Sequence, residues 1–301
     1  MNVISPEELA RGPLEASETL SGLILLDKPW GKTPLQALDL LRNKFPRLAG
    51  VPLSYAGRLD PLADGLLVVL VGETNKDRET YLGLTKVYEF EVLVGLGTDT
   101  GDIFGVVQND ALDDSVYDSG SVQEKITTLV SQYAGQHIFE YPVYSSKTVE
   151  GKPLFQYAQE GLISDGFIHI TKCDENNQEV KERIKIPSKE VTIFDMNVIG
   201  TKKVSTVDVL EKIQRAISIV SGNFRYDEIQ KTAESKVSND RTGSGASFLV
   251  VKIQVKCSSG TYMRAIAEDI GRDIGIPCIA YSIRRIKVGD FDITSKDVVS
   301  L

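Results

Sequence analysis

The stretch SYAGRLDPLADGLLVVL (54–70) begins as a polar turn and ends as an almost unbroken apolar run. In its middle, Asp60 stands directly before Pro61 and a few residues ahead of the apolar run 66–71. A residue before proline is displaced from the helical region, so we expect Asp60 to project from an extended loop beside a strand buried on both faces. Such a carboxylate either is held by a partner or takes part in chemistry. Taken alone, it could cap a turn or pair with Arg58.

The residues before this stretch predict a strand and a helix. Residues 23–26 form a short apolar strand, which is followed by a turn at 29–31. Thr33 before Pro34 is typical of a helix start and predicts a helix over 34–45. The expected buried stripe of this helix comprises Leu35, Leu38, Leu41 and Phe45.

The residues after it predict another strand and helix. The stretch VYEFEVLVGLG (87–97) alternates strictly between apolar and polar residues, which is typical of a strand with one buried face. Ser121 and Glu124 match a capping box for a helix that runs to about residue 135. The face of the strand that we expect to be buried carries Tyr88, Phe90, Val92 and Val94, with Glu89 and Glu91 opposite.

Towards the C-terminus, FLVVKIQVKC (248–257) predicts an alternating strand that leads through SSGT into a helix over YMRAIAEDIGRDIG (262–275). We expect Thr261 to be its N-cap and Arg264 to lie at the edge of its apolar face. That face comprises Met263, Ile266, Ala267, Ile270 and Ile274. Because strands and helices mix without a regular βαβ rhythm, the fold class is α+β with a large mixed sheet.

Residues 200–247 differ in character from the rest of the chain. VSTVDVLEKIQRAISIVSG (204–222) predicts an amphipathic helix. ESKVSNDRTGSGAS (234–247) is polar and rich in glycine, and it predicts a mobile loop.

Composition restricts the class of protein. The chain has 301 residues, 42% hydrophobic and 25% charged, which are ordinary values for a globular protein with a sizeable core. No apolar run approaches the roughly 18–20 residues of a membrane span, and the acidic N-terminus lacks the apolar region of a signal peptide. Cys173, Cys257 and Cys278 match neither a disulfide framework nor a zinc pattern, which favours a reducing cytoplasm. The net charge of −8 counts against nucleic acid as a partner.

Several kinds of site are excluded or disfavoured. His137 and His169 lack a nearby nucleophile motif or a second ligand, so we interpret both as structural. GLGTDTG (95–101) follows a strand but misplaces the third glycine of a dinucleotide fingerprint. Asp99 and Asp102 lack calcium-loop spacing, and the segment is typical of a turn that bonds its own backbone. Catalysis in this chain would therefore depend on carboxylate, tyrosine, arginine and lysine side chains.

The motifs in their order resemble the TruB family of tRNA pseudouridine synthases, over residues 22–200 and 248–291. The segments that carry the resemblance are GLILLDKPWGKTP, YAGRLDPLADGLLVVLVGETNK, KVYEFEVLVGLGTDTGDIFG, YPVYSSKTVEGKPLFQYAQEG, IPSKEVTIFD and CSSGTYMRAIAEDIGRDIG with RRIKVGDF. The element GRLDPLADGLL, the KVY strand and GTYMR are its most specific parts.

The resemblance implies a pseudouridine-synthase fold: α+β, with a mixed, mainly antiparallel central sheet flanked by helices and a thumb-like RNA-binding insertion. It also implies isomerisation of a uridine in the T arm of tRNA (position 55), without cofactor or metal. Asp60 matches the family's catalytic aspartate, Tyr88 the tyrosine that stacks on the target base, and Arg264 the arginine that pairs with the aspartate. Lys28 and Pro29 match a Lys-Pro element near the active site.

Further residues are candidates for substrate binding. The thumb-like segment, at about 141–161, matches the family's RNA-gripping loop and helix. The binding candidates are Tyr55, Lys28, Pro29, Arg58, Tyr144, Lys147, Lys152, Tyr262 and Arg285. An RNA substrate requires a local basic face despite the acidic net charge, for which the candidates are Lys147, Lys152, Arg284, Arg285 and Lys287.

The implied chemistry suits these residue types. The reaction breaks the N1–C1′ glycosidic bond, rotates the uracil and rejoins it through C5. The uridine must first be extruded from folded RNA at a cost of a few kcal/mol, which stacking on an aromatic ring offsets. An ionised carboxylate could add to the uracil ring, attack C1′ or take a proton from the sugar, and the three routes stay open. A neighbouring arginine would lower the carboxyl pKa by about 1–3 units and orient the group.

The chain also departs from the family. Tyr55 stands where bacterial members usually place a histidine. We expect an acidic extension at 1–21, a catalytic domain at 22–291 and a short tail at 292–301, without room for the PUA domain of most relatives. An atypical insertion at about 200–247 either supplies RNA binding in place of that domain or is a surface loop.

The alternative functions are a non-catalytic tRNA-binding or tRNA-folding protein on the same fold, or a synthase that acts on another RNA. We expect a monomer without a membrane contact or a small-molecule cofactor. Retention of the aspartate, the tyrosine and the arginine together favours the enzyme, because a protein that only binds RNA needs none of them.

Overall fold

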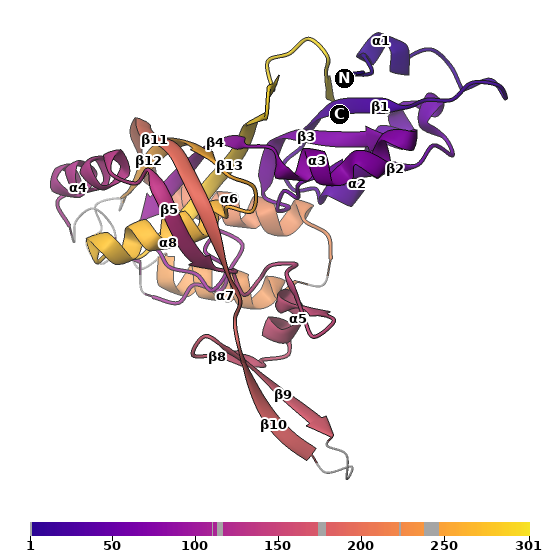
Figure 1. Ribbon diagram of the computed structural model, residues 1–301. Helices are drawn as coiled ribbons and strands as arrows, with labels where there is room; N and C mark the ends of the chain where they lie inside the picture. The colour runs from indigo at the N-terminus through magenta and orange to yellow at the C-terminus, as the bar shows by residue number, and fades with distance from the viewer. Residues whose placement is uncertain (1, 110, 113–116, 174–178, 223, 238–246) are drawn as a thin grey trace.

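The computed structural model describes residues 2–109, 111–112, 117–173, 179–222, 224–237 and 247–301 (Figure 1). Its helices are α1 (Pro6–Leu9), α2 (Pro34–Lys44), α3 (Arg78–Gly83), α4 (Ser119–Ser131), α5 (Leu154–Gln159), α6 (Thr206–Ile219), α7 (Tyr226–Val237) and α8 (Met263–Ile274), with 3-10 turns η1 (Pro46–Leu48) and η2 (Gly72–Asp77). Its strands are β1 (Gly22–Lys28), β2 (Leu53–Ala56), β3 (Ala63–Val71), β4 (Lys86–Val94), β5 (Gly135–Glu140), β6 (Thr148–Val149), β7 (Lys152–Pro153), β8 (Ile163–Ser164), β9 (Phe167–Cys173), β10 (Glu179–Lys185), β11 (Ser188–Ser205), β12 (Ser247–Cys257), β13 (Cys278–Val288), β14 (Phe291–Asp292) and β15 (Val298–Ser300).

One large sheet organises the structure. Its order is β15-β1-β3-β13-β4-β12-β11-β5, with β2 paired to β3 and β14 paired to β13. β15 is parallel to β1 and β13 is parallel to β3, whereas the other described pairs of this sheet are antiparallel. The predicted α+β class with a mixed, mainly antiparallel sheet is confirmed.

The sheet consists of two halves that meet at a short junction. β3 pairs with β13 only over 63–65 and 283–285, whereas β13 pairs with β4 along most of its length. Helices α4 and α8 cover one face of the β4–β12 half, and α6 and α7 cover the other (Figure 1). In the β1–β3 half, α2 covers one face. The loop that carries Asp60 enters β3 directly at the junction.

The hydrophobic patterns of the sequence predict most of the strands and helices correctly. The strands at 23–26, 66–71, 87–94 and 248–257 are present as β1, β3, β4 and β12, and the helices at 34–45 and 204–222 as α2 and α6. The tyrosine-bearing face of β4 is buried as expected. In α2, however, the prediction that Leu35 is buried is wrong. Leu35 is 63% exposed, and Ala37 instead completes the buried face of the helix.

Three predictions of helix ends are wrong. The capping box of Ser121 and Glu124 does not form, because α4 starts earlier, with Asp118 accepting from the amides of Gly120 and Ser121. This helix ends at Ser131, short of residue 135. The N-cap of α8 is Tyr262, and the Thr261 hydroxyl instead donates to the Ser258 carbonyl.

The region 200–247 is more regular than expected. β11 extends to Ser205, and a second helix, α7, runs to Val237, into the segment predicted to be a loop. Residues 238–246 of that segment lie outside the described residues. Both helices bury apolar side chains against the sheet, including Ile213 and Ile229. These two helices therefore form a packed layer over the sheet.

Both ends of the chain pack into the sheet half of β1. Ile4 and Leu9 are buried in the same cluster as α2, although the composition of 1–21 predicts an extension outside the catalytic domain. β15, from the expected tail 292–301, pairs with β1, and its Val299 is buried. No described helix is long and apolar enough to cross a membrane.

Gly65 generates a prediction about stability. Its φ is +98°, and a Cβ at this position would lie 2.3 Å from the Arg285 carbonyl oxygen at the β3–β13 junction. Gly50 has a similar φ of +73° but open space around it, so it isolates the cost of the backbone conformation. We expect Gly50→Ala to lower the unfolding free energy by about 1–2 kcal/mol. Gly65→Ala should cost a further ~1–3 kcal/mol through overpacking, measured by urea unfolding. Equal losses of unfolding free energy in the two variants would contradict the close contact between residue 65 and the Arg285 carbonyl.

Candidate active site

A buried arginine holds the carboxylate of Asp60. Arg264 Nε, from the first turn of α8, donates to Asp60 Oδ2 at 2.8 Å. Arg264 is only 3% exposed, whereas the Asp60 side chain is 36% exposed. The cation is thus fixed inside the protein and the anion remains accessible from outside. The structure forms the pair that the sequence resemblance implied.

The rest of the guanidinium is also bound. Arg264 Nη1 donates to the Thr100 carbonyl at 2.8 Å, and Nη2 donates to the Tyr144 carbonyl at 3.3 Å. These carbonyls come from the turn after β4 and from the thumb-like segment. Because a guanidinium is planar, contacts on three of its edges fix the direction in which it presents Nε to Asp60.

Asp102 is a second carboxylate beside this arginine. Its Oδ2 lies 3.8 Å from Arg264 Nε, and its Oδ1 accepts from Thr100 Oγ1 at 2.8 Å and from the Phe104 amide at 2.9 Å. Burial raises the pKa of the Asp102 carboxyl, although Arg264 acts in the opposite direction. Burial by itself would lower the pKa of the Arg264 guanidinium. The neighbouring charges of Asp60 and Asp102 have the larger combined effect, so its pKa is raised.

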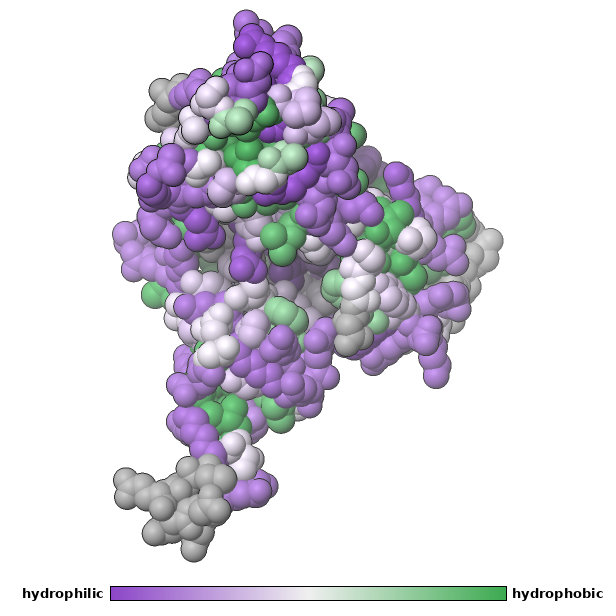
Figure 2. All heavy atoms as spheres, turned by 90° about the vertical axis from the view of Figure 1, so that its right-hand side faces the viewer, coloured by the Kyte–Doolittle hydropathy of each residue, from purple (hydrophilic) through white to green (hydrophobic). Residues whose placement is uncertain are grey.

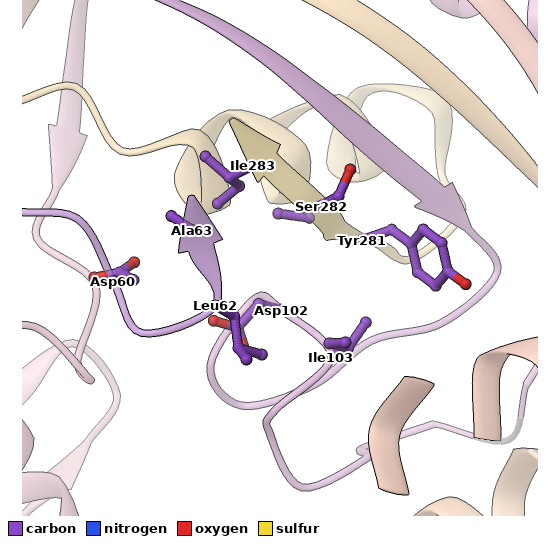
Figure 3. A pocket seen from close by; sticks show the side chains of 9 residues that line it. Asp60, Leu62, Ala63, Asp102, Ile103, Tyr281, Ser282 and Ile283 are labelled. Atoms are coloured by element: carbon purple, nitrogen blue, oxygen red, sulfur yellow. The ribbon is translucent and has the colours of Figure 1, made fainter. Parts of the chain in front are cut away.

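A pocket lies between these loops and β13. It is a small hollow lined by Asp60, Leu62, Ala63, Asp102, Ile103 and residues 280–283 (Figure 3). Asp60 and Asp102 reach it from two different loops, whereas Ser282 and Ile283 belong to β13 (Figure 3). The pocket is mostly apolar with acidic groups at one side. Such a lining suits a small, flat, mostly uncharged group next to an anion.

The Asp60 loop is anchored by the buried ammonium of Lys28. Its Nζ donates to the carbonyls of Pro29 at 3.0 Å, Lys32 at 2.5 Å and Pro61 at 3.4 Å. Burial lowers the pKa of Lys28 to about 8. The predicted direct contact between Lys28 and substrate is therefore wrong, because this ammonium is fully buried and occupied by the main chain.

Arg285 supports the other side of the same loop. It is 1% exposed, and its guanidinium donates to the carbonyls of Leu66 at 2.7 Å and of Arg58 and Gly57 at 3.3 Å each. The prediction that Arg285 belongs to an RNA-facing basic surface is wrong for the same reason. Arg58, by contrast, is exposed and remains a candidate for substrate binding.

Two tyrosines lie near the carboxylate. Tyr88 on β4 is buried in the same cluster as Leu59, directly before Asp60, and Ala63, three residues after it. Burial raises the pKa of the Tyr88 phenol. Burial, followed by the charge of Asp60, raises the pKa of Tyr262 to about 12. Both phenols are therefore neutral near pH 7.

Tyr55 is not part of this pocket. It lies on β2 opposite Val69, and its partly buried ring packs against the cluster formed by α2 and β1. Leu59, directly before Asp60, packs into a different cluster. A direct contact between the Tyr55 ring and a base in the pocket is not supported by this placement, because the ring packs in the α2 cluster and does not line the pocket.

The predicted basic face is largely neutralised. Arg284 pairs with Asp27 at 2.9 Å and with Asp64 at 3.3 Å. Lys287 pairs with Asp292 at 2.8 Å, and Lys152 pairs with Glu160. The Lys147 ammonium lies 5.1 Å from the centre of the Tyr141 ring and remains a candidate for RNA contact. The sequence could not indicate these pairs, because no local pattern specifies which carboxylate each cation meets.

The thumb-like segment is tied to the site by α7. Arg225 Nη1, next to the start of α7, lies 2.6 Å from Asp99 Oδ2, and its guanidinium stacks 4.7 Å from the centre of the Tyr144 ring. Burial, followed by Asp99, raises the pKa of Tyr144 to about 12. The Tyr144 carbonyl in turn accepts from Arg264. Sequence reasoning missed Asp99, Asp102 and Arg225 as neighbours of the site, although the acidic turn after β4 was the available signal.

The arrangement supports chemistry at a single accessible carboxylate. Asp60 can act as a nucleophile or as a base, while the hydrogen bond from Arg264 orients it. Pro29 lies in the turn that Lys28 closes. Within the described residues, no group of three or more His, Cys, Asp or Glu side chains is arranged to hold a metal ion.

Comparison with known proteins gives consistent matches. A family model described as TruB family pseudouridylate synthase (N terminal domain) matches residues 51–215. The tRNA pseudouridine synthase B of Azoarcus sp. (strain BH72) is 29% identical over 273 residues, which cover 91% of this chain and 66% of that protein. The tRNA pseudouridine synthase B of Endomicrobium trichonymphae is 27% identical over 282 residues, covering 93% of this chain and 90% of that protein.

Similarity of fold extends to a solved complex. A chain of the Cbf5-Nop10-Gar1 crystal structure matches with a TM-score of 0.50 and 15% identity, covering 93% of this chain and 52% of that chain. At this identity the match concerns the fold alone. The chain also spans only about two thirds of the length of the Azoarcus relative.

The buried arginine generates a prediction with a defined pH dependence. Arg264→Met leaves Asp60, Asp102 and Glu268 without their cation, so we expect a loss of about 3–5 kcal/mol in unfolding free energy at pH 7. A carboxyl whose folded pKa lies above its unfolded value binds more protons when folded, so lowering the pH restores stability. The deficit relative to wild type should therefore shrink between pH 7 and pH 5 in urea unfolding. Arg272→Met, on the exposed side of α8, is the matched control and should lose little at either pH. A deficit that stays constant or grows at pH 5 would refute the buried-charge account.

Proposed function

This chain belongs to the TruB family of pseudouridylate synthases, and we propose that it is an enzyme that isomerises uridine to pseudouridine in tRNA. The observation that carries the proposal is the Asp60–Arg264 pair, because it combines an accessible carboxylate with a buried cation beside a hollow between two loops and β13. The names of the relatives, which are tRNA pseudouridine synthases, support tRNA as the substrate class.

In the proposed reaction, a uridine leaves its stack and places its base beside Asp60. The cost of extrusion is a few kcal/mol, and contact with the neutral ring of Tyr88 offsets it. Asp60 then adds to the uracil ring, attacks C1′ or takes a proton from the sugar, and the N1–C1′ bond breaks. The detached uracil turns within the pocket and rejoins the sugar through C5. No atom is gained or lost, so no diffusible co-reactant is needed.

Arg264 has a positioning role in this scheme. Its Nε donates to Asp60, and its contacts with Thr100 and Tyr144 keep Nε aimed at the carboxylate. Tyr262 and Tyr144 border the same region and would contact the extruded nucleotide or its neighbours. Lys147 and Arg58 are the cations of the predicted set that are neither buried nor paired with a carboxylate among the described residues.

The finer specificity is also part of the proposal. We expect position 55 in the T arm of tRNA as the target, a monomeric enzyme and a cytoplasmic location. The cytoplasmic location is supported by the buried thiols of Cys257 and Cys278, which are unpaired. Burial raises the pKa of Cys257 to about 11 and that of Cys278 to about 12, so both remain protonated.

Asp60→Asn is the decisive variant. The amide keeps the size of the side chain but removes the negative charge, so pseudouridine formation should disappear while tRNA binding stays within a few-fold of wild type. The matched control is Asp64→Asn, which removes another partly buried aspartate that pairs with an arginine, Arg284. Pseudouridine is mapped in an unmodified tRNA transcript after incubation with each variant. More than a few percent of wild-type activity in Asp60→Asn would refute the assignment, and a wild type that binds tRNA without turnover would identify an RNA-binding protein instead.

Arg264→Lys tests the positioning role separately. Lysine keeps a positive charge but loses the planar fork that contacts Asp60, Thr100 and Tyr144 at once. We expect the variant to fold and bind tRNA but to lose most of its turnover, seen as a fall in kcat. Wild-type kcat in this variant would show that charge alone is sufficient.

A further inference from the structure

The β9–β10 hairpin is the most projecting part of the described structure. It extends from the body beyond α5 in Figure 1, and it forms the narrow lower projection in Figure 2. Each strand has seven residues, which corresponds to about 23 Å at roughly 3.3 Å per residue. The hairpin belongs to a separate small sheet, β10-β9-β8, so it is not needed to complete the large one.

The two faces of this hairpin differ in charge. Because successive residues of a strand point to opposite faces, Lys181, Arg183 and Lys185 share one face of β10. Their partners on β9 are Thr171, His169 and Phe167, respectively, so this outer face carries no carboxylate along 181–185. All three cationic residues are exposed, and Arg183 lies 4.2 Å from the centre of the Phe167 ring.

The inner face consists of apolar residues and one ion pair. Ile168 is buried, and Ile170 and Ile184 pack with it against the cluster that contains Leu154 and Tyr157 of α5. The carboxylate of Glu182 lies on this inner face and pairs with Lys172 at 2.9 Å. The packing therefore fixes which face points outwards.

Among the described residues, the carboxylates near the outer face lie at its two ends. Lys185 is 3.9 Å from Glu140 at the base, and Glu179 lies on the same face near the tip. Within the described part of the chain, Lys181 and Arg183 have no carboxylate partner. This contrasts with Arg284, Lys287 and Lys152, which are paired, in a chain of net charge −8.

We propose that the outer face of the β9–β10 hairpin, formed by Lys181, Arg183 and Lys185, binds the phosphate backbone of the RNA substrate outside the catalytic pocket. The proposal rests on the proposed function for the identity of the RNA. Three cations about 7 Å apart along an exposed strand suit an extended polyanion. The three side chains are already exposed to solvent, so the protein need not rearrange to present them. The face lies beyond the segment 141–161 that the sequence assigned to RNA gripping.

The test removes the three charges and compares the result with a matched control. The hairpin variant is Lys181→Ser/Arg183→Ser/Lys185→Ser, and the control is Lys125→Ser/Lys231→Ser/Lys296→Ser, which removes three exposed lysines elsewhere. Both are built on Asp60→Asn, and binding of an unmodified tRNA transcript is measured from low to physiological salt. Melting temperatures confirm that both variants fold.

We expect the hairpin variant to bind tRNA roughly ten-fold more weakly at low salt than the control. The slope of log K against log salt should become shallower by about 0.7–0.9 for each phosphate that the variant no longer binds. With Asp60 intact, the change should fall on KM for tRNA rather than on kcat. An affinity and a salt slope equal to those of the control would overturn the proposal and leave the hairpin open to a protein partner.

The outcomes separate this proposal from the proposed function. If the wild type binds tRNA in a hairpin-dependent manner but forms no pseudouridine, the catalytic assignment fails and the hairpin surface stands. If turnover is normal and the hairpin variant behaves like its control, only the hairpin proposal fails. A wild type that does not bind tRNA at all overturns both.

Discussion

The structure of the site depends on one buried guanidinium. Arg264 is out of reach of water, so its charge has to be balanced by groups of the protein, and those groups come from separate parts of the chain. Asp60, Asp102 and the carbonyls of Thr100 and Tyr144 all meet it. Of the two carboxylates, Asp60 is the more accessible, at 36% against 14% for Asp102. Burying the cation and exposing one anion concentrates reactivity at a single carboxylate, and it makes the geometry of that carboxylate a property of the core.

Two further buried cations hold the loop that carries Asp60 by binding its main-chain carbonyls. Lys28 binds the loop through Pro61, and Arg285 binds it through Gly57 and Arg58. A buried cation that is satisfied by carbonyls costs desolvation energy, and the depressed pKa of Lys28 reflects that cost. The compensation is a loop whose backbone, rather than only its side chains, is held from two sides. Family membership of the chain fits this arrangement, because the GRLDP element is the part of the sequence that these cations bind.

Local sequence patterns predict the helices and strands. Which charged side chains are exposed depends instead on partners that are distant in the sequence. The alternation in β4 places Tyr88 inside because strand periodicity depends on neighbouring residues only. Whether Arg285 is exposed depends on carbonyls more than 200 residues earlier, which no local pattern contains. The pairing of Asp60 with Arg264 could be expected from the family motifs, but the contribution of Asp102 could not. The turn after β4 resembles an ordinary turn until α8 is packed against it.

The distance along the chain between Asp60 and Arg264 has a consequence for how the protein acquires its site. The two residues are 204 positions apart, and the edge strand β15 reaches back to β1. Long-range pairing of this kind requires closing large loops before the native pairs can form, which slows folding. During synthesis, Asp60 emerges long before its partner, so the loop, the turn and the thumb-like segment exist first without the cation that joins them. The site is therefore assembled late and as a unit, and a nascent chain that has not yet reached α8 has no partially competent form of it.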